Sequence, residues 1–401
     1  MLRRQAQQKA FRNYMTGLLS DRHRDPVAQL VTNQSGGSYS GLRHYLRSAP
    51  WNADAVNERR IESLYACRQT KPRRGFTLVV DDSSHAESAA VAAGVERQFV
   101  TVNETKVRYV MRATHLTDGV RNIPLDLHVS AHPYPERDLM ESRAHYARPD
   151  IILQLIDRSL ARKYRPGTVY ISGGYSLDTF LITQLQVREL TYVAALLGSS
   201  QVECQIPGIP ELQRGCLRDL LHQIPPMLWI PARTPEPDAP HASTERWTAT
   251  LRVKLSHVEG WHWLVISIDR PSPGLATNIV YLASNASTRA FSPASTWAIY
   301  SQRQMMAEFY RDARSLLNLS EYCLDSPRSL MRHWMLLYAA YTFITWHQLT
   351  GSLQRQTQRK ISSFSEAVDA YRAILAAVKP PTPVVAKTIS HPSALASEQV
   401  S

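Results

Sequence analysis

The chain lacks the features that mark membrane proteins and disulfide-stabilised secreted proteins. Its four cysteines, Cys67, Cys204, Cys216 and Cys323, form no C-x-x-C pair and have no zinc-site spacing, so we expect free thiols in a reducing compartment. The N-terminal segment is basic but contains no apolar signal-peptide core. The longest apolar run, residues 334–346, is shorter than the roughly 18 residues that a membrane span needs. We therefore expect a cytoplasmic protein without a membrane partner.

Acidic residues are scarce relative to basic ones, and the imbalance is uneven along the chain. The formal net charge is +12, from 46 Lys and Arg against 34 Asp and Glu. Residues 1–75 contain 14 of these basic residues and five of the acidic ones, a local net charge of +9. A basic segment of this kind suits a polyanion, and nucleic acid is the first candidate. A basic surface that serves only solubility is the alternative.

Hydrophobic periodicity divides the chain into helical and strand-rich parts. Residues 1–75 have helical periodicity and end in a basic linker, KPRRG. Three expected strands, then helix, strand, helix and strand, occupy the region from Phe76 to about residue 204, which is an α/β order with a mixed sheet. Residues 205–245 are proline-rich and expected to be irregular, and antiparallel strands follow to about residue 285. Helices are then expected over 297–319, 326–349 and 362–378, before a disordered Pro- and Ser-rich tail.

Three short blocks of sequence follow one another in a recognisable order. The first is LVVDDSSHAES with GVERQF after it, in which Asp81 ends an expected strand. The second is TVYISGGYSLDTF, in which Ser172 lies three residues before Tyr175. The third is YSQRQMMAEFYRDAR, with Tyr300, Arg303, Ala307 and Arg314 at a regular spacing. The order and spacing of these blocks resemble those of the insertion-sequence DDE transposases, whose third block reads Tyr-x2-Arg-x3-Glu-x6-Lys.

This resemblance implies an α/β, RNase H-like mixed sheet flanked by helices, with a β-rich insertion and a helical N-terminal domain. The implied parts are a basic DNA-binding domain, the first part of the core, the β-rich insertion, the C-terminal helices of the core and a disordered tail. Their expected boundaries are 1–75, 76–204, 205–295, 296–378 and 379–401.

Such enzymes hold two divalent metal ions with Asp, Asp and Glu, since Mg²⁺ prefers anionic oxygen ligands. Carried over to this sequence, the three positions are Asp81, Ser172 and Ala307, so only Asp81 is a carboxylate and a weak metal ligand. Glu308 and Asp178 are possible substitutes. Glu308 is turned by about 100° from the required direction if its segment is helical, and Asp178 suits a helix N-terminus.

Most of the DNA-contacting residues that accompany the metal ligands in this family have counterparts in this sequence. The resemblance implies phosphate contacts by Tyr300, Arg303 and Arg314, and we also expect Arg73, Arg74 and Arg97 to contact DNA. A solvated basic helix face is the alternative for the third block.

The sequence thus predicts a pseudoenzyme: a DNA-binding protein derived from a DDE transposase, without a cofactor, acting as a regulator or as a subunit of a nucleoprotein complex. Its expected partners are double-stranded DNA, other proteins of such a complex and a second copy of itself, at the nucleoid. One alternative is an active transposase that uses Mg²⁺ or Mn²⁺ for DNA cleavage and strand transfer. Another is a remnant that serves as a protein scaffold with no meaningful DNA affinity.

Overall fold

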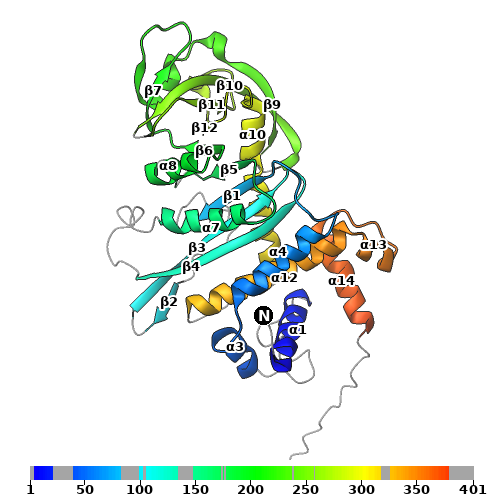
Figure 1. Cartoon of the computed structure of the whole chain (residues 1–401). Coiled ribbons are helices and arrows are strands. Elements are labelled where there is room, and N and C mark those ends of the chain that lie inside the picture. The colour runs from blue at the N-terminus through cyan, green and yellow to red at the C-terminus, as the bar shows by residue number, and fades with distance from the viewer. Residues whose placement is uncertain are drawn as a thin grey trace, which may run out of the picture.

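The computed structural model shows a long, curved sheet with helices on both faces (Figure 1). The structure describes residues 4–20, 39–82, 99–102, 105–133, 148–172, 175, 178–236, 239–256, 258–317 and 326–378. The expected tail, 379–401, and Arg97 lie outside these ranges. No helix in the described ranges is long and apolar enough to cross a membrane.

The central part of the sheet is mixed, as the sequence predicts. Strand β1 pairs antiparallel with β3 and parallel with β5, and β5 pairs parallel with β6. The hairpin of β3 and β4 extends one side, with β2 beside β3. These strands are β1 (Thr77–Asp82), β2 (Phe99–Val102), β3 (Thr105–Thr117), β4 (Asn122–Pro133), β5 (Thr168–Ile171) and β6 (Tyr192–Leu196). Every residue of β1 is buried, which explains its nearly continuous apolar sequence.

The β-rich insertion continues this same sheet, because β12 pairs antiparallel with β6. The sheet order from there is β12, β11, β10, β7 and β8, with β9 beside β10. These strands are β7 (Gln201–Gln205), β8 (Gln213–Cys216), β9 (Ile230–Glu236), β10 (Ala239–Leu255), β11 (His262–Ile268) and β12 (Ile279–Ser284). The expectation that residues 205–245 are irregular is wrong for β8, β9 and the start of β10. Prolines sit within β9, which pairs with β10 only, so a missing N–H is tolerated there.

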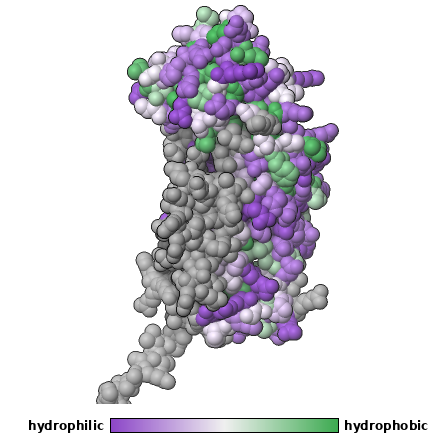
Figure 2. Space-filling model, turned by 90° about the vertical axis from the view of Figure 1, so that its left-hand side faces the viewer, coloured by the Kyte–Doolittle hydropathy of each residue, from purple (hydrophilic) through white to green (hydrophobic). Residues whose placement is uncertain are grey.

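Exposed apolar side chains gather on this lobe, at the top of Figures 1 and 2. Figure 2 shows green patches among purple side chains there, whereas hydrophilic side chains predominate on the visible part below. The large apolar side chains that are exposed in the lobe include Leu212, Met227, Ile230 and Leu275. They lie in the 3-10 turns η2 (Pro226–Leu228) and η3 (Pro273–Leu275) and in or beside strands.

Two hydrophobic clusters fill the two faces of the sheet. One lies under α1, α3, α10, α11, α12 and α14, and the other lies under α7 and α8. The helices are α1 (Gln5–Leu19), α3 (Tyr39–Arg47), α4 (Ala53–Ala66), α7 (Pro149–Ala161), α8 (Thr179–Val187), α9 (Leu217–Leu220), α10 (Pro293–Ser301), α11 (Arg303–Leu316), α12 (Pro327–Leu349), α13 (Ser352–Thr357) and α14 (Phe364–Val378), with η1 (Leu221–Gln223) after α9. The single helix expected over 297–319 is therefore two helices that meet at Gln302.

The N-terminal helices pack directly against the C-terminal helix α12. Arg332 of α12 donates hydrogen bonds to the carbonyl oxygens of Leu46 (2.9 Å), Ala49 (2.9 Å) and Trp51 (2.6 Å), and its guanidinium lies 4.7 Å from the centre of the Trp51 ring. These carbonyl groups lie at or just after the C-terminal end of α3, where backbone acceptors have no partner within the helix. One buried cation therefore satisfies several backbone acceptors. The basic N-terminal helices and the core thus share one hydrophobic cluster, although the domain boundaries stay a prediction.

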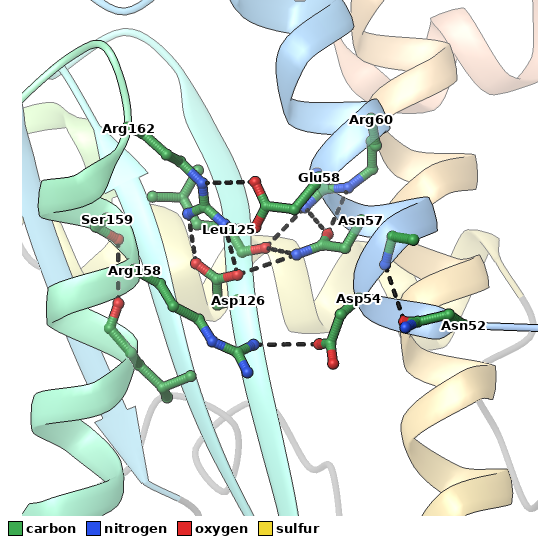
Figure 3. A network of polar contacts seen from close by, with 12 residues as sticks. Asn52, Asp54, Asn57, Glu58, Arg60, Leu125, Asp126, Arg158, Ser159 and Arg162 are labelled. Carbon is green, nitrogen blue, oxygen red and sulfur yellow. Dashed lines mark hydrogen bonds and ion pairs between the residues drawn. The ribbon is translucent and has the colours of Figure 1, made fainter. Parts of the chain in front are cut away.

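A buried polar network joins α4, β4 and α7 (Figure 3). Asp126 of β4 accepts hydrogen bonds from Arg162 Nη1 (2.5 Å) and Nη2 (2.8 Å) and from Asn57 Nδ2 (3.1 Å). Arg60 Nη1 donates to Thr342 Oγ1 of α12 at 2.8 Å. Burial lowers the pKa of Arg60 to about 10, although Asp126 favours its charged form. The network therefore fixes α4 to the sheet and, through Thr342, to α12.

Candidate active site

Asp81 and Ser172 lie at the carboxyl ends of two adjacent parallel strands. The register pairs Val79 with Tyr170 and Val80 with Ile171, so Asp81 and Ser172 follow at the next position. Side chains alternate along a strand, and Val79 and Tyr170 both belong to the cluster under α10–α12. Asp81 and Ser172 are therefore on that same face, on strands about 4.8 Å apart. Asp81 is 4% exposed.

Helix α11 covers this face of the sheet and carries the third position. Ala307 is 8% exposed and part of the same hydrophobic cluster. Tyr310 lies one turn further along α11, on the same side as Ala307. The pKa of Tyr310 is raised by burial, by Tyr338 and by the negative charges of Asp81 and Asp82. The first turn of α11 lies toward the other end of β1, because Gln302 accepts a hydrogen bond from Thr117 Oγ1 and the carbonyl oxygen of Met305 accepts one from Asn122 Nδ2 at 2.6 Å, and Thr117 pairs with Thr77. The structure thus places Asp81 and Ser172 together, and the convergence of Ala307 with them stays a prediction.

The comparisons with known proteins agree with this architecture. A family described as "DDE superfamily endonuclease" matches residues 1–256. The chain belongs to the DDE superfamily of endonucleases. A curated relative, the probable transposase for insertion sequence element IS701 of Microchaete diplosiphon, is 22% identical over 199 residues, which are 49% of this chain and 50% of the relative. The chain therefore matches about half the length of that relative.

Among solved structures, the NurA nuclease from Sulfolobus solfataricus aligns with 76% of this chain and 95% of its own, at 8% identity and a TM-score of 0.28. This score is too low to relate the two folds. The family match itself identifies the mixed sheet and its flanking helices as the RNase H-like fold of DDE endonucleases. The match covers Asp81 and Ser172 but ends before Ala307, so the third position rests on the Tyr300–Arg314 motif alone.

The two acids that could substitute in this chain have neighbours of their own. Asp178 is the N-cap of α8, where its Oδ1 accepts a hydrogen bond from the backbone N–H of Leu181 at 2.8 Å. Glu308 lies near Asp312 and Tyr341. Burial and the charge of Glu308 raise the pKa of Asp312 to about 6, and the pKa of Tyr341 is raised by burial and then by the charges of Asp312 and Glu308. Glu308 therefore faces α12 on another side of α11 from Tyr310.

The neighbouring Asp82 points to the opposite face of β1, and the sequence did not reveal what binds it. Its Oδ2 lies 3.0 Å from Arg112 Nε and accepts a hydrogen bond from the Tyr175 hydroxyl. Arg112 also donates to Ser130 Oγ at 2.7 Å. The carboxylate of Asp82 is thus neutralised within the core. Arg112 stands between Met111 and Ala113 in β3, and an arginine beside apolar neighbours in a strand was the available signal for such a buried partner.

The six predicted DNA contacts fall into three groups. Tyr300 is 7% exposed and packs against Tyr170 and Trp297, and the Arg303 guanidinium lies 4.4 Å from the centre of the Tyr300 ring. Tyr300 is on α10, whereas Arg303 and Arg314 are both on α11, eleven residues apart and therefore on nearly the same side of that helix. The second group, Arg73, Arg74 and Arg314, is exposed. Arg97 lies outside the described residues.

Proposed function

We propose that this DDE-family chain binds double-stranded DNA without cleaving it, as a DNA-binding regulator or as a subunit of a nucleoprotein complex. The observation that carries the proposal is the composition of the site: one carboxylate (Asp81), one hydroxyl (Ser172) and one methyl group (Ala307). Two divalent ions held about 4 Å apart repel each other strongly, and carboxylates are what make their joint binding tolerable. This donor set does not fit a two-metal centre.

The first prediction concerns cleavage. We expect the wild-type protein to leave supercoiled plasmid intact in the presence of Mg²⁺ or Mn²⁺, because two of three metal-binding charges are missing. The assay is nicking followed by agarose electrophoresis, with Asp81→Ala as the matched control. Nicking by the wild type that is absent from Asp81→Ala would show an active enzyme and overturn the proposal. Ser172→Asp combined with Ala307→Glu restores the charges, and calorimetry with Mn²⁺ then tests whether metal binding returns.

The second prediction concerns DNA affinity. The net charge of +9 in residues 1–75 suggests contacts with five or more phosphates. For five contacts, log K is expected to fall with the logarithm of salt concentration at a slope of about −4.5 or steeper. Fluorescence anisotropy with a labelled duplex between 50 and roughly 200 mM salt measures this slope. Asp81→Ala should bind with nearly unchanged affinity. Absence of binding at the lowest salt would favour a protein scaffold instead.

A further inference from the structure

Three loops meet at the edge of the sheet where β1 and β5 begin, which is opposite to the edge of Asp81 and Ser172. The first loop, 67–76, leads into β1, and the second, 162–167, leads into β5. The third is the β3–β4 turn, 118–121, which lies beside the start of β1 because Thr77 pairs with Thr117. Six exposed cations of the first two loops form what we call the basic edge: Arg68, Lys71, Arg73, Arg74, Lys163 and Arg165.

The three loops are held in fixed positions relative to one another. The backbone N–H of Gly167 donates to the carbonyl oxygen of Phe76 at 2.9 Å. A Cβ atom on Gly167 would lie 2.8 Å from the Cα atom of Gly75, whose φ is +74°, so two glycines are needed for this approach. Arg121 joins the turn to the first loop by donating to the carbonyl oxygen of Gln69 at 2.9 Å. The cations therefore extend from rigid backbone positions.

The charge of the basic edge is almost uncompensated. Within the described ranges, Asp118 is the one carboxylate at ion-pair distance from any of the six cations, 3.9 Å from Arg73 Nε. Asp118 is itself buried and already paired with Arg121 at 2.5 Å. The side chain of Arg73 remains 64% exposed. Six cations with long, exposed side chains around one rigid edge suit a row of phosphates better than a single small anion.

We propose that the basic edge is the surface that binds the phosphate backbone of duplex DNA. The proposal rests on the proposed DNA-binding function and locates it. Six residue steps of extended chain separate Gly75 from Asp81, roughly 20 Å along the strand. Phosphates bound at the basic edge are therefore held well away from Asp81. DNA binding at this edge depends on the loops and is independent of the residues at Asp81, Ser172 and Ala307.

The test is duplex binding by the full chain carrying Lys71→Gln, Arg74→Gln and Arg165→Gln together. Each lost phosphate contact lowers affinity about eightfold at 0.1 M salt, so we expect a loss of about 100- to 500-fold and a salt slope less steep by about 2.7. The matched control, Arg214→Gln with Arg233→Gln and Arg270→Gln, removes the same charge from exposed positions of the β-rich lobe. We expect the control to lose less than about fivefold, because long-range charge is screened at this salt.

The outcomes separate this proposal from the function on which it rests. If the wild type does not bind duplex, the proposed function fails. If the wild type binds with a steep salt slope and the loop variant matches it, DNA binding stands and the basic edge is the wrong surface. Equal losses in the loop variant and the control would also overturn the assignment, since net charge alone would explain them. Binding of polyglutamate as tightly as duplex would assign the edge to an acidic protein. Superimposable thermal melts of both variants and wild type confirm that folding is unaffected.

Discussion

Replacing Asp126 by asparagine is expected to destabilise the protein by about 3–5 kcal/mol, because it leaves buried cations without their shared carboxylate. The Asp126 side chain is completely buried and receives two hydrogen bonds from Arg162, whose side chain is 8% exposed. Asp126 also favours the charged form of the buried Arg60 nearby. Glu58, whose side chain is half exposed, forms an ion pair with Arg162 at 2.5 Å (Figure 3). It does not replace the carboxylate that Arg162 loses in the buried interior.

The measurement is chemical denaturation of the wild type and Asp126→Asn at pH 7.5. The matched control is Asp54→Asn, which removes the ion-pair partner of Arg158, and both residues are drawn in Figure 3. That ion pair is 3.1 Å long, with side chains 45% and 47% exposed, so its loss should change stability by about 0–1 kcal/mol. If the free energy of unfolding of Asp126→Asn lies within about 1 kcal/mol of the wild-type value, water must reach this network and the prediction is wrong.

Acidification from pH 7.5 to 5.5 is expected to lower the free energy of unfolding by about 3 kcal/mol. Three buried histidines cause most of this loss. Burial lowers the pKa to about 3 for His115 and His333 and to about 4 for His262. In the unfolded chain the same imidazoles take up a proton near pH 6.5. Below that pH the unfolded state binds more protons than the folded state, so stability falls as the pH falls through 6.5.

Each histidine contributes a loss of about 1.4 kcal/mol at pH 5.5, about 4 kcal/mol together. Asp312 acts in the opposite direction. Its pKa is raised to about 6, so the folded state takes up this proton first and regains about 1 kcal/mol by pH 5.5. Denaturation curves at pH 7.5, 6.5 and 5.5 measure the balance.

A pair of histidine variants separates this cause from general acid effects. His333→Gln should reduce the loss by about 1.4 kcal/mol, since glutamine does not titrate and can still accept a hydrogen bond from the Tyr14 hydroxyl. His222→Gln, at an exposed position, should leave the pH dependence unchanged. A flat stability profile between pH 7.5 and 5.5 would mean that the three imidazoles are protonated in the folded protein.

Most of the fold could be predicted from the sequence because its signals are local. The apolar run of β1 ending in Asp81, the alternation in β3 and β4 and the helical periods of α7 and α12 each specify one element by their own spacing. The break between α10 and α11 at Gln302 and the strand β9 were missed. Nothing in the local pattern marks the first, and the prolines of β9 argue against a strand unless its position at the side of β10 is known.

The candidate site, like the fold, could be predicted only in part from the sequence. The sequence by itself determined that Asp81 is the only carboxylate among the three positions and that the N-terminal part is strongly basic, because composition and order of residues are independent of folding. Only the tertiary structure decided where these groups lie. It paired Val80 with Ile171, turned Glu308 toward Asp312, gave Asp178 to the start of α8 and neutralised Asp82 with Arg112. It also set the basic loops at the opposite edge from Asp81, since such neighbours are chosen by strand register and helix packing between residues distant in sequence.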